Sequence, residues 1–467
     1  MTRLGVLPLA RETFDVAYAE ELAGAGFAAL DTAGFDVVGP RRLLFDAPST
    51  AAAVEELAGT PLDLLLVMQV TFTDASMAEV IASEIAAPIA LWAFPEERTG
   101  GRLRLNAFCG INLAAFALRR AGRGFRYLFR DPAGEGIVDA LRALATGSDL
   151  VPGVHAIPDP AGLAPDAVAR AAEVEGRLAG SRVGVIGDHP VGFGPCGYER
   201  GAVAALTGVD VVRLELEDLF GAASAVADGD LAETRAREAA ALDGFEAVDQ
   251  DELDRSLRLY PALRGIASAS GLDGLAVRCW PEAFTEYGGA VCAPAGLMND
   301  DRLPTACEAD VYGSITALVL QWLSGGAALV ADLIDVDPAS GTGVLWHCGK
   351  GPLSMTDPAF RPRATVHSNR RKPLLHEFPF RPGRVTIARL SQAGGHHSLV
   401  VGGGEMLSAP PAFSGTSGVV RFDTPAAAVA DTVMREGLEH HYGFTYGDVR
   451  PELNALAAAW QIPVVEL

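Results

Sequence analysis

The sequence of 467 residues predicts an α/β protein, in which two doubly wound parallel-sheet domains precede a β-rich, barrel-like C-terminal domain. Short aliphatic segments alternate with amphipathic helical segments up to residue 326, and this alternation is typical of parallel sheets with helical crossovers. From residue 327 onward, closely spaced strand-like segments replace the helices, which indicates an antiparallel sheet or a small barrel. A chain of this length also exceeds what one hydrophobic core usually supports.

The N-terminal domain is expected to span residues 1–178. Its predicted strands cover residues 2–8, 62–67, 88–92 and 124–129, and its predicted helices cover residues 16–30, 50–58, 74–86, 111–121 and 134–146. Because ligands of such sheets bind outside the carboxyl ends of the strands, we expect the loops there to contact a ligand. The candidate substrate-binding residues of these loops are Gln69, Trp92 and Asn112. A polar residue such as Asn112 near a helix start is equally typical of a helix cap.

The second α/β domain is expected to span residues 179–326. It follows a stretch at residues 147–180 that is rich in Pro, Gly and Ala, which indicates a linker with one helix at residues 164–178. The predicted strands are residues 182–186, 209–214 and 272–277, and the predicted helices are residues 197–206 and several that cover roughly 216–266. The loop after residue 277 contains Trp280, a further candidate substrate-binding residue.

A glycine-rich loop in this domain supports an alternative function. Gly192–Gly197 matches the GxGxxG pattern of dinucleotide-binding proteins, so an NAD(P)-dependent oxidoreductase is the second hypothesis. Two details argue against it. Five residues separate the strand from the first glycine, whereas the fingerprint glycine follows its strand directly. Pro195 also removes an N–H from the turn that would bind the phosphates.

The C-terminal domain is expected to span residues 327–467. Its predicted strands are residues 328–337, 342–347, 363–367, 383–390, 397–402, 405–409 and 417–422, followed by helices at 425–436 and 450–460 and a final strand. Seven of the nine histidines follow residue 346, and two adjacent pairs, His396–His397 and His440–His441, compete as metal ligands. Because neighbouring residues of a strand point to opposite faces, we expect at most one residue of each pair to face a given site.

The stretch from Ala306 to Lys350 holds the candidate chemistry. Glu308 and Asp310 stand at the head of an apolar helix, and Asp332 interrupts a strand whose neighbours are aliphatic. Burying a carboxylate in such a strand costs several kcal/mol unless a cation or hydrogen-bond donors meet it. Two such carboxylates on neighbouring elements therefore suggest a shared cation, although acidic residues at helix starts are also common as caps.

His347 lies where a strand of the same stretch runs into a glycine turn, and such loops at strand ends are where functional sites collect. We therefore take His347 as a candidate substrate-binding residue.

Composition and charge limit the class of protein. The formal net charge of −22 argues against nucleic-acid or anionic-membrane partners. No apolar window reaches membrane-spanning length without charged or turn residues, and the first fifteen residues do not resemble a signal peptide, so a cytoplasmic protein is expected. The six cysteines lack CxxC spacing, which argues against a zinc–thiolate site and a disulfide framework. Arginine supplies almost all positive charge, because Lys350 and Lys372 are the only lysines.

Several motifs together resemble a known family. They are Cys307–Val311, Val330–Asp332, His441 and the Tyr446–Asp448 segment that follows it. In this order the motifs resemble the L-fucose isomerase family and its L-arabinose isomerase relatives. Two further motifs, Phe108–Asn112 and Trp346–Gly349, look like those of shorter, divergent members, some of which act on sulfoquinovose. The chain is likewise shorter than a full L-fucose isomerase.

The resemblance implies a divalent-metal-dependent aldose–ketose isomerase that works through an enediol. Carried over residue by residue, it makes Glu308 and Asp332 metal ligands and catalytic groups, and His441 the third ligand. Moving a proton between C1 and C2 needs a base and a cation that holds the developing oxyanion. Two carboxylates and an imidazole suit Mn²⁺, with Mg²⁺ or Co²⁺ as alternatives, and no nucleotide is needed.

The resemblance also implies the partners. The substrate would be a sugar, either sulfoquinovose converted to 6-deoxy-6-sulfofructose or an aldose of the L-fucose or L-arabinose type. An anionic sugar would need arginine, histidine or tryptophan at the far end of the pocket, for which Arg98, Arg102, Arg278 and Trp280 are candidates. The protein would be a homo-oligomer, a hexamer or a trimer-based assembly, with active sites at subunit interfaces that include N-terminal loops of a neighbour.

Overall fold

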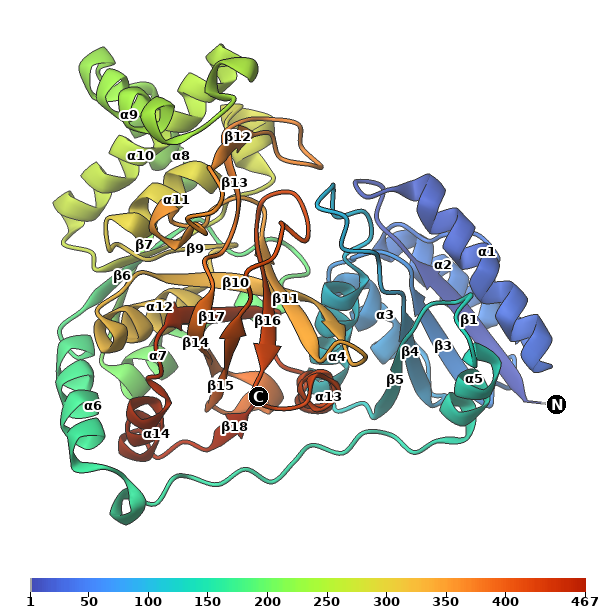
Figure 1. Ribbon diagram of the computed structural model, residues 1–467. Coiled ribbons are helices and arrows are strands. Elements are labelled where there is room, and N and C mark those ends of the chain that lie inside the picture. Colours follow the sequence, from blue (N-terminus) through green and yellow to red (C-terminus); the bar gives the residue numbers. More distant parts are fainter. Residues whose placement is uncertain (1) are drawn as a thin grey trace.

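The first sheet of the molecule is parallel and lies near the N-terminus. The computed structural model describes residues 2–467, and Figure 1 shows this sheet at the right. Its strands are β1 (Arg3–Leu9), β2 (Asp36–Val38), β3 (Leu64–Gln69), β4 (Ile89–Ala93) and β5 (Phe125–Phe129). The strand order is β2-β1-β3-β4-β5 and every neighbouring pair is parallel. The order reverses between β1 and β3, so the segments that follow these two strands border the crevice where such sheets bind ligands.

Five helices belong to the N-terminal part of the chain that contains this first sheet. They are α1 (Val16–Ala33), α2 (Ala47–Leu57), α3 (Ser76–Glu84), α4 (Ala107–Arg120) and α5 (Ile137–Thr146). Helices α1 and α5 pack against each other, whereas α2, α3 and α4 pack in a row. Helix α4 is buried along almost its whole length, because it also contacts β10 and α13 of the C-terminal part. This helix therefore joins the N-terminal sheet to the rest of the molecule.

A long extended segment leads from α5 to α6 (Pro165–Leu178) and on to a second parallel sheet (Figure 1). The strands of this sheet, in the order β7-β6-β8-β9, are β6 (Arg182–Ile186), β7 (Asp210–Leu214), β8 (Gly274–Val277) and β9 (Thr305–Cys307). Its helices are α7 (Arg200–Thr207), α8 (Leu216–Ser224), α9 (Asp228–Ala241), α10 (Gln250–Ser270) and α11 (Cys292–Asp300). Short helical turns are η1 (Pro160–Gly162), η2 (Gly194–Cys196), η3 (Phe245–Ala247), η4 (Ala283–Tyr287), η5 (Leu353–Met355) and η6 (Ala393–Gly395).

The C-terminal part is a mixed sheet that closes into a barrel. Its strands are β10 (Ala328–Asp337), β11 (Thr342–His347), β12 (Arg363–Thr365), β13 (Leu375–Pro379), β14 (Gly383–Ser391), β15 (Ser398–Met406), β16 (Thr416–Phe422), β17 (His441–Tyr446) and β18 (Val464–Glu466), and its helices are α13 (Ala426–Glu436) and α14 (Arg450–Ala459). The order is β12-β13-β16-β11-β10-β17-β14-β15-β18, and an extra pairing of β16 with β15 closes a ring of six strands. The predicted fold class, two parallel-sheet units and a barrel-like end, is confirmed.

Helix α12 (Val311–Ser324) lies at the junction of the second sheet and the barrel, where it packs on β8, β10, β14 and β17. Almost all of its side chains are buried, which is what a helix that is apolar on every side requires. Asp310 caps its first turn by accepting a hydrogen bond from the Gly313 N–H at 2.9 Å. The segment just before α12 is thereby held between two packed layers. The domain limits at residues 178 and 326 stay predictions.

The sequence prediction missed several elements, namely β2, β9, β13, β17 and α11. Strand β9 has only three residues, too few for a period to show. The predicted strand at 405–409 is not separate, because β15 continues to Met406 before the strand ends. No helix within residues 2–467 is both long enough and apolar enough to cross a bilayer.

Candidate active site

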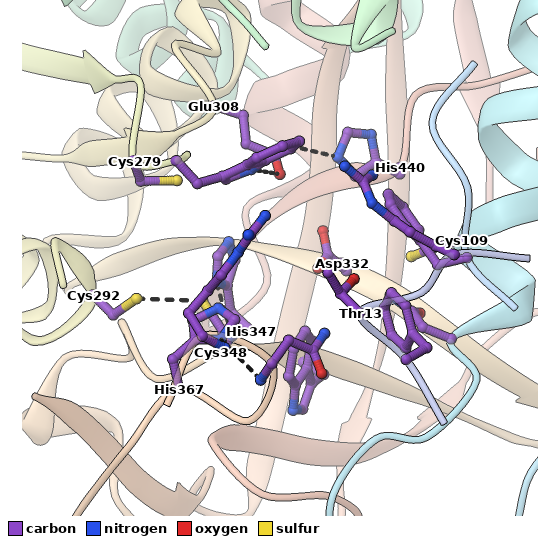
Figure 2. Close-up of a pocket in the computed structure, with 18 of the residues that line it drawn as sticks. Thr13, Cys109, Cys279, Cys292, Glu308, Asp332, His347, Cys348, His367 and His440 are labelled. Atoms are coloured by element: carbon purple, nitrogen blue, oxygen red, sulfur yellow. Dashed lines mark hydrogen bonds and ion pairs between the residues drawn. The ribbon is translucent and has the colours of Figure 1, made fainter. Parts of the chain in front are cut away.

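A cavity of about 130 Å³ lies between the two parallel sheets and the barrel (Figure 2). Segments that follow β1, β3 and β4 form one wall, segments that follow β6, β8 and β9 form a second, and the barrel with the loop after β12 forms the third. The volume is about ten times what one ordered water needs, so a small molecule can enter. Both parallel sheets thus present the carboxyl ends of their strands to one space, as expected for α/β folds.

Glu308 enters this cavity from the short segment between β9 and α12. Its backbone is left-handed, with φ of 59°, and so is that of Ala309, with φ of 56°. Two consecutive non-glycine residues in this region carry strain of the kind that collects at functional sites. The Glu308 carboxylate accepts a hydrogen bond from Trp280 Nε1 at 3.0 Å and lies 3.0 Å from His440 Nε2. Burial raises the pKa of Glu308, but His440, His441 and Trp280 outweigh burial and lower it.

Asp332 and His441 face each other across two neighbouring barrel strands. Asp332 of β10 pairs with His441 of β17 on one side and with Trp346 of β11 on the other. His441 Nε2 lies 3.4 Å from Asp332 Oδ1 and 3.6 Å from Glu308 Oε2. Two of the groups predicted as metal ligands, Glu308 and Asp332, therefore each approach the third, His441, although all three are far apart in the sequence. Their role as ligands stays a prediction.

A buried ion pair orients His441. Asp310 is fully buried and binds Arg389, also fully buried, with Nη2 and Oδ1 3.0 Å apart. The other Asp310 oxygen lies 2.8 Å from His441 Nδ1. An ionised carboxylate only accepts hydrogen bonds, so Nδ1 carries the proton and the Nε2 lone pair points at Glu308 and Asp332. Burial opposes the charge of Asp310, but Arg389 and His441 hold the pKa of that carboxyl well below its usual range.

The charges of these groups favour a cation. Burial and the charge of His440 lower the pKa of His441 to about 4, so its ring is neutral at pH 7. Burial raises the pKa of Asp332 to about 7, and its Oδ1 is buried without a hydrogen-bond donor among residues 2–467. Glu308 and Asp332 therefore both lie near the unprotonated Nε2 of His441, and ionised Asp332 adds a second negative charge beside it. A divalent ion bound by oxygen and imidazole ligands fits this set. The Asp310–His441 pair is the support that metal-binding histidines usually have.

Two more histidines flank this centre. Ligand atoms of Cys196, Glu308, His440 and His441 lie within 4.8 Å of one another, and so do those of Asp332, His347 and His441. The expectation that only one of His440 and His441 faces the site is wrong. His440 precedes β17, where strand alternation does not apply, and the two rings lie 4.0 Å apart. Of the other pair, His397 Nε2 instead lies 2.7 Å from the Tyr312 hydroxyl.

Burial and the neighbouring charges lower the pKa of His347 well below its usual value, so it is neutral as well. This histidine lines the cavity, and its ring stacks on those of Trp346 and His441. Its role in substrate binding stays a prediction.

Three predicted substrate-binding residues lie outside the cavity, which corrects the sequence analysis. Gln69 is fully buried and donates to the Thr71 carbonyl and the Thr73 hydroxyl, so it holds the loop after β3. Trp92 is fully buried and donates to the Arg130 carbonyl at 3.0 Å. Asn112 lies inside α4 and donates to the Leu438 carbonyl. Each side chain supports backbone rather than a ligand.

Trp280, which was also predicted to bind the substrate, does line the cavity, and its side chain donates a hydrogen bond to Glu308. The three predicted arginines do not line it. Arg98 pairs with Asp335, Arg278 pairs with Glu282, and Arg102 donates to the Thr13 carbonyl and Asn369. Two arginines that the sequence analysis missed, Arg11 and Arg370, line the cavity instead. The sequence did contain an indication for Arg11, because this residue follows the first strand and so lies at the carboxyl edge of the sheet, where ligands bind.

The Gly192–Gly197 loop does not have the geometry of a phosphate-binding loop. The N–H groups of Phe193, Cys196 and Gly197 donate to carbonyls of residues 190–194, so they are not free for an anion. The helix after the loop, α7, begins only at Arg200. The loop instead brings Phe193 to the cavity wall and Cys196 to within 3.8 Å of Glu308.

Comparison with known proteins places this fold and site in one family. Residues 5–155 match the N-terminal domain of fucose/sulfoquinovose isomerases, and residues 345–467 match the C-terminal domain of L-fucose isomerase. The chain is 31% identical to the sulfoquinovose isomerase of Clostridium sp. (strain MSTE9) over 97% of both chains. It is 28% identical to that of Alkalicoccus urumqiensis over 99% of this chain and 98% of the relative. It is 27% identical to that of Priestia aryabhattai over 96% of this chain and 95% of the relative.

The fold and the comparisons define a sugar aldose–ketose isomerase. The chain belongs to the fucose/sulfoquinovose isomerase family, as the motifs around Glu308, Asp332 and His441 predicted. A solved structure of the radical S-adenosylmethionine methyltransferase TsrM from Kitasatospora setae aligns over 66% of this chain and 67% of its own, at 17% identity. Its TM-score of 0.21 is too low to indicate a shared fold.

Proposed function

We propose that this protein is a divalent-metal-dependent aldose–ketose isomerase, and that Glu308, Asp332 and His441 hold the ion. The observation that carries the proposal is the approach of Glu308 Oε2 and Asp332 Oδ1 to within 3.6 and 3.4 Å of His441 Nε2. Within residues 2–467 no group donates a hydrogen bond to Asp332 Oδ1, and His441 Nε2 carries no proton while Nδ1 binds Asp310. Oxygen and imidazole ligands suit Mn²⁺, with Mg²⁺ or Co²⁺ as alternatives.

The bound ion would act as a Lewis acid for neighbouring oxygens of the sugar and would stabilise negative charge that develops there. The residues of the chain supply the rest of the chemistry. Glu308 and Asp332 have pKa values that differ, because Glu308 is held ionised by its histidine and tryptophan partners whereas burial raises the pKa of Asp332 to about 7. Two carboxyl groups with separated pKa values are suited to an acid and a base role.

We assign the proton transfer between C1 and C2, through an enediol, to these two carboxyl groups. Trp280 holds Glu308 through its N–H, and Asp310 holds His441, so neither group has to reorganise when the substrate enters. His347 lies beside Asp332 and His441 and would position a sugar hydroxyl. Aromatic side chains from all three walls exclude water from the reacting atoms.

The proposed substrates are those that the family comparison suggests. Three relatives that match almost the full length of the chain are named sulfoquinovose isomerase, which favours conversion of sulfoquinovose to 6-deoxy-6-sulfofructose. An aldose of the L-fucose or L-arabinose type is the other candidate. A homo-oligomer is also proposed, but N-terminal residues of the same chain, such as Phe72, Asn106 and Cys109, already line the cavity. Light scattering of the purified protein would measure the oligomeric state.

A panel of aldoses with added Mn²⁺ tests the proposed activity. We expect ketose formation from at least one sulfonated or 6-deoxy aldose, and incorporation of solvent deuterium at C2 of the recovered aldose. Chelation of the ion should abolish both signals, and readdition of Mn²⁺ should restore them. Ketose formation without deuterium incorporation in either sugar would argue for a hydride shift instead of an enediol, and full activity after chelation would refute the metal assignment.

A further inference from the structure

The cavity has a second polar end, which is formed by two arginines. Arg11 follows β1 at the switch point of the first sheet, and Arg370 lies in the loop after β12. Their guanidinium carbons lie 5.1 and 5.8 Å from the ring of Trp280. The N–H of the same indole donates to Glu308. One tryptophan side chain therefore separates the arginines from the carboxylate end of the cavity.

The charge of these two arginines is poorly neutralised by the protein. Among residues 2–467, no carboxylate forms an ion pair with Arg370. Arg11 has a single ion pair, a long contact of 3.4 Å between its Nη1 and Asp74 Oδ2. Both guanidinium groups lie against the ring of Trp280, and burial and the charge of Arg11 lower the pKa of Arg370. Two neighbouring cations that have one long carboxylate contact between them keep an excess of positive charge, which a bound anion would neutralise.

The surrounding loop is built to hold these donors in place. Arg102 donates to the Thr13 carbonyl at 2.7 Å and to Asn369 Oδ1 at 3.0 Å, so it ties the segment of Arg11 to the loop of Arg370. His367 Nδ1 accepts the backbone N–H groups of Asn369 and Arg370, each at 3.2 Å. A neutral histidine then carries its proton on Nε2, and this ring lines the cavity across from Glu308 and His440 (Figure 2).

We propose that Arg11 and Arg370 bind a terminal anionic group of the sugar, a sulfonate or a phosphate on the carbon farthest from the aldehyde. The proposal rests on the proposed function, because it needs C1 and C2 of the sugar at Glu308 and Asp332. Guanidinium groups donate paired hydrogen bonds to tetrahedral oxyanions, and Trp280 would lie along the carbon chain between the two ends. A neutral sugar would leave both cations desolvated without a partner, so the site selects for charge.

Kinetics with matched substrates test this assignment. The substrates are an aldose with a 6-sulfonate, the same aldose with a 6-phosphate, and the neutral 6-hydroxy form, each with the Mn²⁺-loaded wild type, Arg11→Gln and Arg370→Gln. We expect wild-type kcat/KM to be at least about tenfold higher for one of the anionic sugars than for the neutral sugar. Each variant should raise KM for that anionic sugar about tenfold or more with little change in kcat, and should not raise KM for the neutral sugar, which offers the arginines no anion to bind. The anion that wild type prefers identifies the sulfonate or the phosphate as the ligand.

Two controls separate this role from a structural one. Arg371→Gln removes the same charge from the same loop, but Arg371 is exposed and does not line the cavity, so its KM values should match wild type. Arg370→Lys keeps the charge without the planar fork and should recover part of the lost affinity. Equal losses for anionic and neutral sugars in Arg370→Gln, or an equal effect of Arg371→Gln, would overturn the proposal.

A binding measurement keeps this proposal distinct from the proposed function. The methyl glycoside of the 6-sulfonated or 6-phosphorylated sugar has no free aldehyde and cannot isomerise. Calorimetry should show that the wild type binds one of these glycosides and that Arg370→Gln binds it about tenfold more weakly. If no aldose is converted but this difference holds, the isomerase proposal fails and the anion site stands. Equal affinity in wild type and variant would refute the anion site even if the enzyme isomerises sugars.

Discussion

The two ends of the cavity are built in different ways. At the carboxylate end, Asp332 and His441 sit on neighbouring barrel strands, and the buried Asp310–Arg389 pair holds the imidazole. At the arginine end, the polar groups come from loops, and their side chains are only partly buried. Of the groups assigned to the chemistry, Asp332 and His441 therefore stand on strands, and Glu308 is held on the short segment between β9 and α12. The groups assigned to substrate choice stand on loops, which change more easily between relatives.

Replacing either carboxylate should have the largest effect. Glu308→Gln and Asp332→Asn keep the size of the side chain but remove a ligand and a proton acceptor. We expect kcat to fall by about 10²–10⁴-fold in each variant, and bound metal to fall with it. Steady-state kinetics and elemental analysis of the purified variants measure both. Near-normal turnover with normal metal content would show that the chemistry belongs to another part of the cavity.

Removing Asp310, which holds the ring of His441, should have the second-largest effect. Asp310→Asn leaves Arg389 buried without its counter-charge and removes the acceptor for His441 Nδ1. We expect metal affinity to fall about 10–100-fold. The free energy of unfolding should fall by about 3–5 kcal/mol.

Metal titration followed by denaturant unfolding separates these two effects of Asp310→Asn. His441→Gln is the matched variant, because it should weaken metal binding while leaving the Arg389–Asp310 pair intact. Unchanged metal affinity in folded Asp310→Asn would contradict the orienting role.

Metal binding at the carboxylate end should depend on pH. In the metal-free protein burial raises the pKa of Asp332 to about 7, so this carboxyl holds a proton below that pH, whereas the unfolded chain loses it near its ordinary value. The stability that this group contributes is therefore present at acid pH and is lost as the pH rises toward about 7. A bound ion must displace that proton, so affinity should fall about tenfold per pH unit below this value.

The rise in melting temperature on adding Mn²⁺ measures this pH dependence. It should be larger at about pH 8 than at about pH 6 in the wild type, because the ionised carboxyl binds the ion. The rise should change less with pH in Asp332→Asn, which has no carboxyl to titrate. An equal rise at both values in the wild type would mean that Asp332 is not a ligand.

Added salt should have a smaller effect, and it should change sugar binding at the arginine end more than metal binding at the carboxylate end. Arg11 and Arg370 are only partly buried, whereas Asp332 and His441 are buried. Raising NaCl from about 0.05 to about 0.5 M should increase KM for an anionic aldose by a few-fold, because salt screens exposed charges more than buried ones. The Mn²⁺ affinity and the KM for the neutral aldose should change less. Equal salt dependence of all three quantities would remove the distinction between the two ends.

Much of the carboxylate end was predictable from the sequence, because an aspartate within an aliphatic strand and a glutamate before an apolar helix are unusual. The family resemblance added His441. The partners of these residues were not predictable, since Arg389 and Asp310 are separated by 79 positions and His441 and Asp310 by 131. No local pattern joins residues so far apart.

The arginine end was predicted less well. Arg278 was expected at this end, but Glu282, four residues later, neutralises it, and that spacing is visible in the sequence. Arg370 could not be found, because it lies in an irregular loop where no period indicates which side chains face inward. Gln69, Trp92 and Asn112 were chosen as loop residues at strand ends, but their polar atoms satisfy buried backbone groups instead.

Mn²⁺ binding to the purified chain tests the convergence of Glu308, Asp332 and His441 most directly. The wild type and His441→Ala would be titrated after removal of metal, with His397→Ala as the control, because His397 binds Tyr312 away from this centre. We predict one tightly bound ion per chain in the wild type and in His397→Ala, and loss of that ion in His441→Ala. An unaltered ion count and affinity in His441→Ala would contradict the assignment of the site.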